Sequence, residues 1–227
     1  MNKYDVIIIG AGPSGIFCAY ELMRQKPDMK VLMIEKGRSI EKRQCPKRTT
    51  KVCVGCKPCS ITTGFAGAGA FSDGKLSLSP DVGGTLPEIL GYEKAEELIK
   101  EADNIYLKFG ADEKVYGIDD YEAIERIRAK AIRANLKLIE CPIRHLGTEE
   151  GYKIYTRLQE HLLASGVEIK FMTMVQDIII EDGVAKGVVT DKDETYYADE
   201  IVSGIGREGS SWFEGICKNH GIKTQNG

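Results

Sequence analysis

A small set of residues near the N-terminus has the types and spacing needed to bind a dinucleotide. Gly10, Gly12 and Gly15 form a Gly-x-Gly-x-x-Gly pattern, and Glu35 follows 20 residues after the last glycine. Such glycines permit a tight turn, close approach of the backbone to a pyrophosphate, and close helix packing. An acid at this distance can accept hydrogen bonds from a ribose. The predicted cofactor-binding residues of this segment are Gly10, Gly12, Pro13, Ser14, Gly15, Glu35 and Lys36.

The flanking residues predict the elements that would position this motif. Residues 4–9 form a continuous apolar run rich in β-branched side chains, which is typical of a buried parallel strand. A helical pattern follows the glycines, and a second apolar strand over residues 31–34 ends at Glu35. The free N–H groups and the dipole of the helix would then bind the pyrophosphate. Together these elements predict a Rossmann-like unit.

A second group of strands is expected near the C-terminus. Residues 167–171 form a strand that leads to Val175, and three short strands over residues 177–181, 184–190 and 195–198 follow. Asp-Gly and Asp-Lys-Asp separate these three strands, which indicates hairpin turns. A further buried strand over residues 200–203 ends in a glycine turn. The sequence therefore predicts an α/β fold with a parallel sheet, an antiparallel β-meander and an inserted helical segment.

This order of elements resembles the FAD/NAD(P)-binding superfamily of glutathione reductase and the flavoprotein hydroxylases. The resemblance implies FAD as the cofactor, a backbone contact from Val175 to the adenine, and a glycine turn at Gly204 and Gly206 beside the FAD phosphates. The usual Ala-Thr-Gly of that turn is replaced by Ser-Gly-Ile-Gly.

Four cysteines lie close together in the middle of the chain, with the spacing C-x7-C-x2-C-x2-C. Gaps of two residues allow successive thiolates to point at one centre, as in zinc and iron–sulfur sites. We interpret the cluster as a zinc or iron–sulfur site, with a redox-active thiol pair and free thiols as the alternatives. The order differs from the ferredoxin pattern, in which Cys-Pro comes last. The predicted metal ligands are Cys45, Cys53, Cys56 and Cys59.

A loop of small residues over positions 64–76 follows the cysteines. Glycine and alanine at this density allow backbone to pack against a flat ligand. We interpret the loop as a cover for FAD, with Ser72, Asp73, Gly74 and Lys75 as contacts, rather than as a flexible linker. The cysteines and the Phe-Ser-Asp-Gly-Lys motif resemble a family of bacterial FAD-dependent dehydrogenases. That resemblance implies FAD and a redox activity, with NAD(P)H as a candidate electron donor, and no particular substrate.

Two amphipathic helices are predicted between residues 84 and 142. Their apolar stripes run from Ala95 to Phe109 and from Tyr121 to Ala131, and we expect both stripes to be core. His145 follows them, and a hydrogen-bonded structural role is favoured over proton transfer. The expected division is an FAD-binding portion over residues 1–84, a helical insertion over 85–142, and a second FAD-binding portion over 143–227.

Composition excludes several classes of function. The net charge is −3, which gives no reason to expect nucleic acid or an anionic membrane surface as a partner. We interpret the basic run from Lys36 to Lys51 as a solvated loop. No stretch approaches the ~20 apolar residues of a membrane span. Seven cysteines without a targeting signal are typical of a reducing compartment, so a cytoplasmic location is expected.

The favoured function is an FAD-dependent oxidoreductase, or its N-terminal half, that acts on a small-molecule substrate or redox partner. The alternatives are an NAD-using enzyme similar to thiazole synthase and a non-catalytic dinucleotide- or metal-binding fragment. Members of the superfamily have a further C-terminal portion that covers the flavin, so this chain alone is expected to hold FAD weakly and to lack activity. No catalytic residue is assigned.

Overall fold

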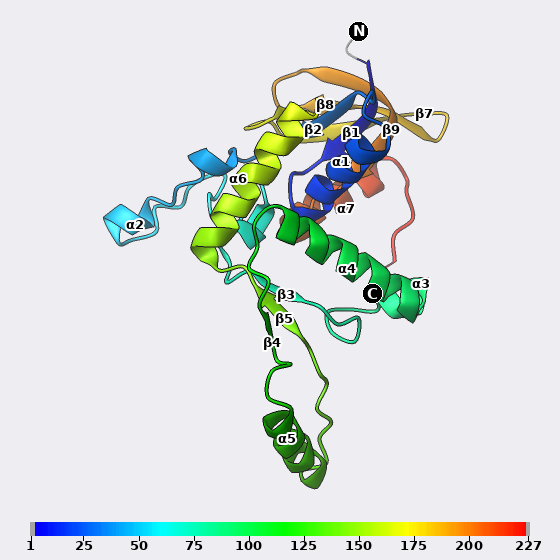
Figure 1. Cartoon of the computed structure of the whole chain (residues 1–227). Coiled ribbons are helices and arrows are strands. Elements are labelled where there is room, and N and C mark those ends of the chain that lie inside the picture. The colour runs from blue at the N-terminus through cyan, green and yellow to red at the C-terminus, as the bar shows by residue number, and fades with distance from the viewer. Residues whose placement is uncertain (1–2, 226–227) are drawn as a thin grey trace. The chain divides into compact units, whose positions relative to one another are not determined.

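A computed structural model describes residues 3–225 of the chain. The chain divides into two compact units, of which the first comprises residues 1–70 and 155–227 and the second residues 71–154. Both are drawn in Figure 1. Within the described residues, no helix combines the length and apolar character needed to cross a membrane.

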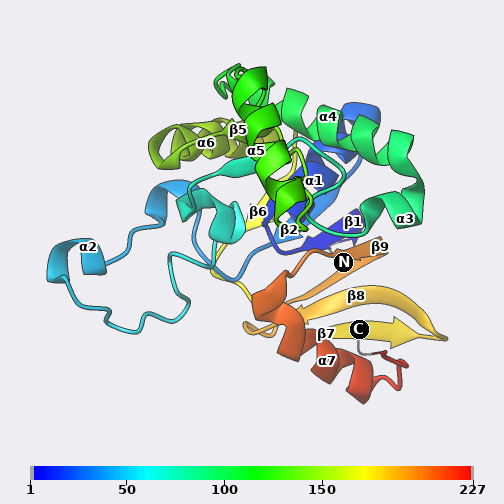
Figure 2. The ribbon, with the colours of Figure 1, turned by 90° about the horizontal axis from the view of Figure 1, so that it is seen from below.

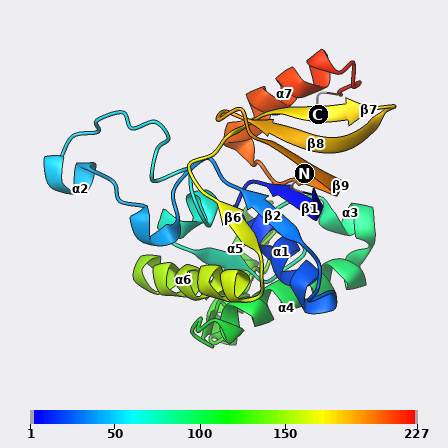
Figure 3. The ribbon, with the colours of Figure 1, turned by 90° about the horizontal axis from the view of Figure 1, so that it is seen from above.

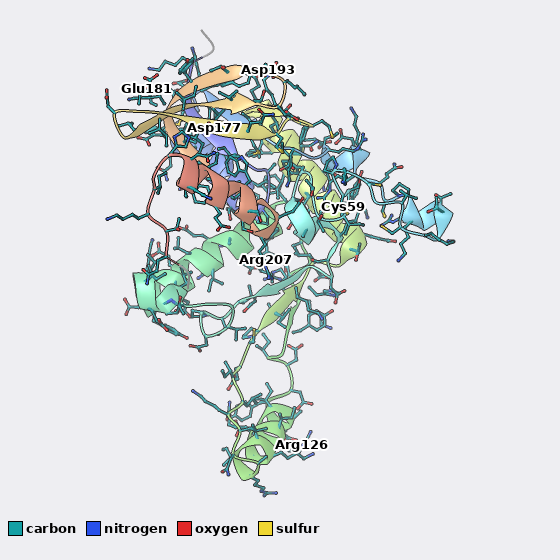
Figure 4. All side chains as sticks on the ribbon, turned by 180° about the vertical axis from the view of Figure 1, so that it is seen from behind. Cys59, Arg126, Asp177, Glu181, Asp193 and Arg207 are labelled. Atoms are coloured by element: carbon teal, nitrogen blue, oxygen red, sulfur yellow. The ribbon has the colours of Figure 1, made fainter. Side chains whose placement is uncertain are left out.

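The first unit contains a six-stranded sheet. Its strands are β1 (Lys3–Ile9), β2 (Val31–Ile34), β6 (Glu168–Lys170), β7 (Val175–Glu181), β8 (Val184–Thr190) and β9 (Thr195–Ser203). The spatial order is β6-β2-β1-β9-β8-β7. The pairs β6–β2, β2–β1 and β1–β9 are parallel, whereas β9–β8 and β8–β7 are antiparallel. Glu181 and Asp193, labelled in Figure 4, lie at the two turns of this meander.

Most helices of this unit lie on the two sides of the sheet, whereas the short α2 (Lys47–Thr50) lies in a loop away from the sheet (Figure 3). The helices on the sheet are α1 (Pro13–Gln25), most of α6 (Thr148–Ala164) and α7 (Ser210–Asn219). Three 3-10 turns, η1 (Ile40–Lys42), η2 (Gly67–Phe71) and η3 (Arg207–Gly209), complete the connections. Figures 2 and 3 show α1 and α6 on one face of the parallel strands, and α7 against the meander.

Alternating side chains of the parallel strands fill the core. Ile7 and Ile9 of β1 point to a cluster that includes Leu32, Val188 and Ile216, all of them buried. Because successive side chains of a strand point to opposite faces, the residues between them face the other side of the sheet. That side is buried as well, which explains why the sequence reads as an apolar run without polar interruptions.

The second unit is built on a small antiparallel sheet of order β3-β5-β4. Its elements are β3 (Lys75–Ser77), α3 (Leu86–Leu90), α4 (Tyr92–Lys108), β4 (Val115–Tyr116), α5 (Tyr121–Arg133) and β5 (Ile143–His145). Arg144 of β5 is buried and pairs with Asp103 of α4 through Nε–Oδ1 at 2.5 Å and Nη2–Oδ2 at 2.8 Å. Its Nη1 also donates to the carbonyl oxygen of Asp112 at 2.6 Å, so this side chain ties a strand, a helix and a loop together.

The predicted α/β fold, with its parallel strands and meander, is confirmed. Two details of the prediction were wrong. The strands expected at 195–198 and 200–203 are one continuous strand, β9, whose first residues pair antiparallel with β8 and whose residues from Tyr197 onward pair parallel with β1. The stripe on α5 is not core, since no residue of α5 is buried and Tyr121 is 71% exposed.

Candidate nucleotide-binding site

A cleft of about 490 Å³ opens at the carboxyl ends of β1, β2 and β9 in the first unit. This is the edge at which ligands bind in open α/β sheets. All of its lining residues belong to the first unit. They are Ile9, Gly10, Gly12, Pro13, Ser14, Ile34, Glu35, Lys36, Thr62, Thr63, Gly64, Gly67, Ala68, Thr173, Met174, Val175, Gly204, Ile205, Gly206, Arg207, Glu208, Gly209 and Trp212.

The glycine turn between β1 and α1 forms one wall of the cleft. Gly10 has φ +96°, and a Cβ on Gly15 would lie 2.1 Å from the carbonyl oxygen of Gly10, so neither position accommodates a side chain. A Cβ on Gly12 would meet nothing closer than 4.0 Å, which leaves its backbone open to the cleft. The α1 helix starts with Pro13 and has neither a capping side chain nor an acid in its first turn. Its N-terminus is therefore suited to an anion.

Glu35 lies at the end of β2 and is 5% exposed. Its two carboxylate oxygens accept hydrogen bonds from the backbone N–H groups of Ala11 at 2.8 Å and Gly37 at 2.7 Å. These bonds fix the carboxylate between the glycine turn and the chain after β2. A carboxylate has about four acceptor sites, so two remain for a ligand in the cleft.

The loop over residues 60–67 lies against the glycine turn. The N–H of Ala66 donates to the carbonyl oxygen of Ala11 at 2.7 Å, and the N–H of Phe65 donates to that of Arg38 at 2.9 Å. Arg43, which is 2% exposed, holds the loop from behind. Burial lowers the pKa of its guanidinium to about 10, so the group is still charged at neutral pH. It donates to the carbonyl oxygens of Ser60, Ile61, Phe65 and Gly67 at 2.6–3.0 Å.

A network around Glu208 links opposite sides of the cleft. One carboxylate oxygen accepts from the hydroxyl of Thr63 at 2.5 Å, and the other lies 3.0 Å from the Nζ of Lys36. The adjacent Arg207, labelled in Figure 4, also lines the cleft. Lys36 and Arg207 both line the cleft, as do Gly204 and Gly206 of the glycine turn after β9.

The structure brings most of the predicted binding residues together. Gly10, Gly12, Pro13, Ser14, Glu35, Lys36, Val175, Gly204 and Gly206 all line the cleft, and Gly15 packs beneath it. Ser72, Asp73, Gly74 and Lys75 belong to the second unit, and their contact with FAD stays a prediction.

In the second unit, these four residues form a local polar cluster with His145. The carboxylate of Asp73 lies 3.1 Å from the Nζ of Lys75 and 3.4 Å from the Nε2 of His145. The Oγ of Ser72 accepts the N–H of Gly74 at 3.1 Å. Lys75 and His145 are direct partners in the β3–β5 pairing, which explains why the motif and the histidine meet.

The predicted metal site is not supported. Among residues 3–225, no group of three or more His, Cys, Asp and Glu side chains is placed to hold a metal ion. Cys45, Cys53, Cys56 and Cys59 are all free thiols, and α2 lies between the first two.

Cys59 lies in a hydrogen-bonded turn of its own segment. It accepts hydrogen bonds from the backbone N–H groups of Thr62 and Ile61 and from the Thr62 side chain, which lower the pKa of its thiol. Cys59, labelled in Figure 4, is exposed and follows α2 in the chain.

Comparisons with known protein families match two separate parts of the chain. The model of the Thi4 family matches residues 1–41, and that of the pyridine nucleotide-disulphide oxidoreductases matches residues 121–227. A thiamine thiazole synthase from Coprinopsis cinerea is 52% identical over 33 residues, which are 14% of this chain and 10% of that protein.

Solved structures are similar over nearly the whole chain. Glycine oxidase from Geobacillus kaustophilus superposes with a TM-score of 0.55 at 14% identity, covering 98% of this chain and 60% of that one. Glycine oxidase from Bacillus cereus gives 0.53 at 18% identity, with coverages of 96% and 58%. The THI4 protein of Thermovibrio ammonificans gives 0.52 at 14% identity, with coverages of 97% and 64%. The chain thus spans about three fifths of the length of these structures, and the likeness shows a shared fold.

Sequence reasoning missed several residues of the site, among them Arg43, Glu208 and Trp212. Arg43 was included in a basic run interpreted as solvated, yet it is one of the most buried charged residues. Glu208 and Trp212 follow the last glycine turn and belong to no recognised sequence motif. The position of Trp212 just after a predicted phosphate turn was the one available signal, since large aromatic side chains often line ligand clefts.

Proposed function

We propose that this chain is the FAD-binding part of an oxidoreductase that transfers hydride or electrons through the flavin to a small-molecule substrate or redox partner. The observation that carries the proposal is the fixed carboxylate of Glu35 beside the open N-terminus of α1. Together they offer acceptors for a ribose and donors for a pyrophosphate within one cleft.

Several features of the cleft support an adenine dinucleotide as its ligand. Gly12 leaves room for a pyrophosphate to approach the backbone, and the N–H groups of the first turn of α1 face the same space. Arg207 adds positive charge to the lining, whereas the charge of Lys36 is paired with that of Glu208. When bound, FAD supplies the hydride or electron chemistry, while the residues of this chain bind it and orient it.

The meander and the comparisons favour FAD over other dinucleotides. Strands β7–β9 lie within the segment that matches the pyridine nucleotide-disulphide oxidoreductase family. The glycine oxidases share the fold and are oxidases by name. Contacts from Ser72, Asp73, Gly74 and Lys75 to the cofactor, and NAD(P)H as the electron donor, are further parts of the proposal.

A second candidate is an enzyme similar to thiamine thiazole synthase, which would use NAD. The match of residues 1–41 to the Thi4 family favours it. That segment holds β1, α1 and β2, which are the elements that any dinucleotide-binding Rossmann unit shares. The choice between the candidates therefore depends on which nucleotide the cleft prefers.

Titration of nucleotide-free protein with FAD and NAD⁺ tests the proposal. We expect FAD to bind more tightly. Glu35→Ala should weaken FAD binding by roughly 1.5–3 kcal/mol, because hydrogen bonds to a charged acceptor are lost. Glu21→Gln is the matched control, since Glu21 is a partly exposed acid of α1 that pairs with Arg24 and does not line the cleft.

Equal affinities of wild type and Glu35→Ala for FAD, with both proteins folded by circular dichroism, would refute the assignment of Glu35. A preference for NAD⁺ would favour the second candidate.

A further inference from the structure

Trp212 lines the cleft next to the chain segment that runs beside Glu35. The N–H of Thr173 donates to the carbonyl oxygen of Glu35 at 3.1 Å, so the chain after Thr173 runs directly beside this residue. Three residues further on, the carbonyl oxygen of Gln176 accepts the indole N–H of Trp212 at 3.0 Å. Glu35, Met174 and Trp212 all line the same cleft.

The indole ring is held in place from several sides. It is half-buried and packs against the core cluster that contains Val175. The hydrogen bond to Gln176 fixes the orientation of the ring, and a second bond holds α7 on β7, because the Nε2 of His220 lies 2.8 Å from the Oδ1 of Asp177. Trp212 is thus a rigid part of the cleft wall.

The geometry of a nucleotide determines which part of the ligand meets this wall. The base and the phosphates are attached to different carbons of the ribose. With the ribose at Glu35 and the pyrophosphate at the N-terminus of α1, the base would extend from the side of the ribose away from the phosphates. The chain after Thr173 passes beside Glu35. The lining residues there, Met174, Val175 and Trp212, offer apolar surface and one aromatic ring.

We propose that the indole of Trp212 stacks on the adenine base and makes the cleft selective for adenine nucleotides. The inference rests on the proposed function and adds to it the residue that recognises the base. Stacking suits this role because purines and indoles both present broad π faces, and a preformed platform loses little conformational entropy on binding.

Fluorescence gives a direct test because Trp212 is the only tryptophan of the chain. ADP should quench the tryptophan emission of the wild type saturably, since stacking places the base on the ring. Inorganic pyrophosphate should bind without quenching, because it occupies the N-terminus of α1 alone.

Variants provide the second readout. Trp212→Ala should bind ADP about tenfold more weakly than the wild type, and Trp212→Phe should retain most of the affinity. Pyrophosphate should bind equally to the wild type and to both variants. Equal binding would show that the variants have not lost the structure of the cleft. Phe213→Ala is the control, because its ring is next to that of Trp212, with centroids 6.1 Å apart, but does not line the cleft.

Three outcomes would overturn the inference. If ADP binds by calorimetry without quenching, and Trp212→Ala binds it like the wild type, the base lies elsewhere while the FAD proposal stands. If both Trp212→Ala and Trp212→Phe lose pyrophosphate binding as well, Trp212 has a structural role instead. If neither FAD nor ADP binds to the wild type, the proposed function fails together with the inference.

Discussion

Replacing Arg43 by methionine should loosen the loop that lies against the glycine turn. Met has a similar length and no donors, so the change removes the hydrogen bonds to the carbonyl oxygens of Ser60, Ile61, Phe65 and Gly67. The bond to Phe65 is buried and the other three are partly buried. In the variant, water can therefore reach some of these acceptors in place of the arginine, but it cannot reach every one of them.

The structure allows the size of this effect to be worked out. Hydrogen bonds to a charged group contribute roughly 1.5–3 kcal/mol each, so four would total about 6–12 kcal/mol if each counted in full. Two terms reduce this sum. The variant no longer carries the cost of burying a charge, which is visible in the lowered pKa of Arg43, and water reaches the outer acceptors. We expect a net loss of about 2–4 kcal/mol.

Hydrogen exchange measures this loss where it arises. The amides of Phe65, Ala66 and Gly67, which donate to backbone carbonyls in the wild type, should exchange roughly 30- to 1,000-fold faster in Arg43→Met. Amides of β8 should change only by the global loss of stability. Arg38→Met is the control, because Arg38 is an exposed arginine of the same segment. Unchanged exchange at residues 65–67 would refute the role given to Arg43.

Two further predictions follow from charged and reactive groups. Iodoacetamide should modify Cys59 before Cys18 at neutral pH, because backbone and Thr62 hydrogen bonds lower the pKa of the Cys59 thiol while burial raises that of Cys18. The rate at Cys59 should reach its plateau at a lower pH than the rate of an ordinary thiol does, and Thr62→Val should slow the reaction at neutral pH. Equal rates at Cys59 and Cys18 by peptide mass spectrometry would contradict this. Arg144→Met should lower the free energy of unfolding by about 3–5 kcal/mol, because Asp103 would keep a buried charge without its partner. A urea unfolding transition like that of the wild type would show that the pair contributes nothing to stability.

The parts of the fold that the sequence predicted depend on neighbouring residues. The strand, turn, helix and strand from Tyr4 to Glu35 have local signals: a β-branched run, glycines at fixed spacing and a helical stripe. The turns of the meander have similar local signals at Asp182 and Asp193, both of which have positive φ. Such features can be predicted from the sequence because the backbone conformation that each needs is determined by its own residues.

The parts that failed depend on partners far away in the sequence. Nothing local indicates that β9 pairs on both edges, so its two halves were read as separate strands. The stripe on α5 indicates an amphipathic helix but not whether another element covers it. Cysteine spacing does not reveal that Cys59 bonds to its own turn. The burial of Arg43 follows from acceptors up to 24 residues away.

The most direct test of the central claim is to identify the nucleotide that the protein selects. Purified protein, freed of nucleotide, is dialysed to equilibrium at high protein concentration against equimolar FAD, FMN, NAD⁺ and NADP⁺, and the nucleotide enriched on the protein side is identified by chromatography and mass spectrometry. We expect enrichment of FAD by the wild type and by Glu21→Gln, and markedly less by Glu35→Ala. Enrichment of NAD⁺, or of no nucleotide, would contradict the central claim.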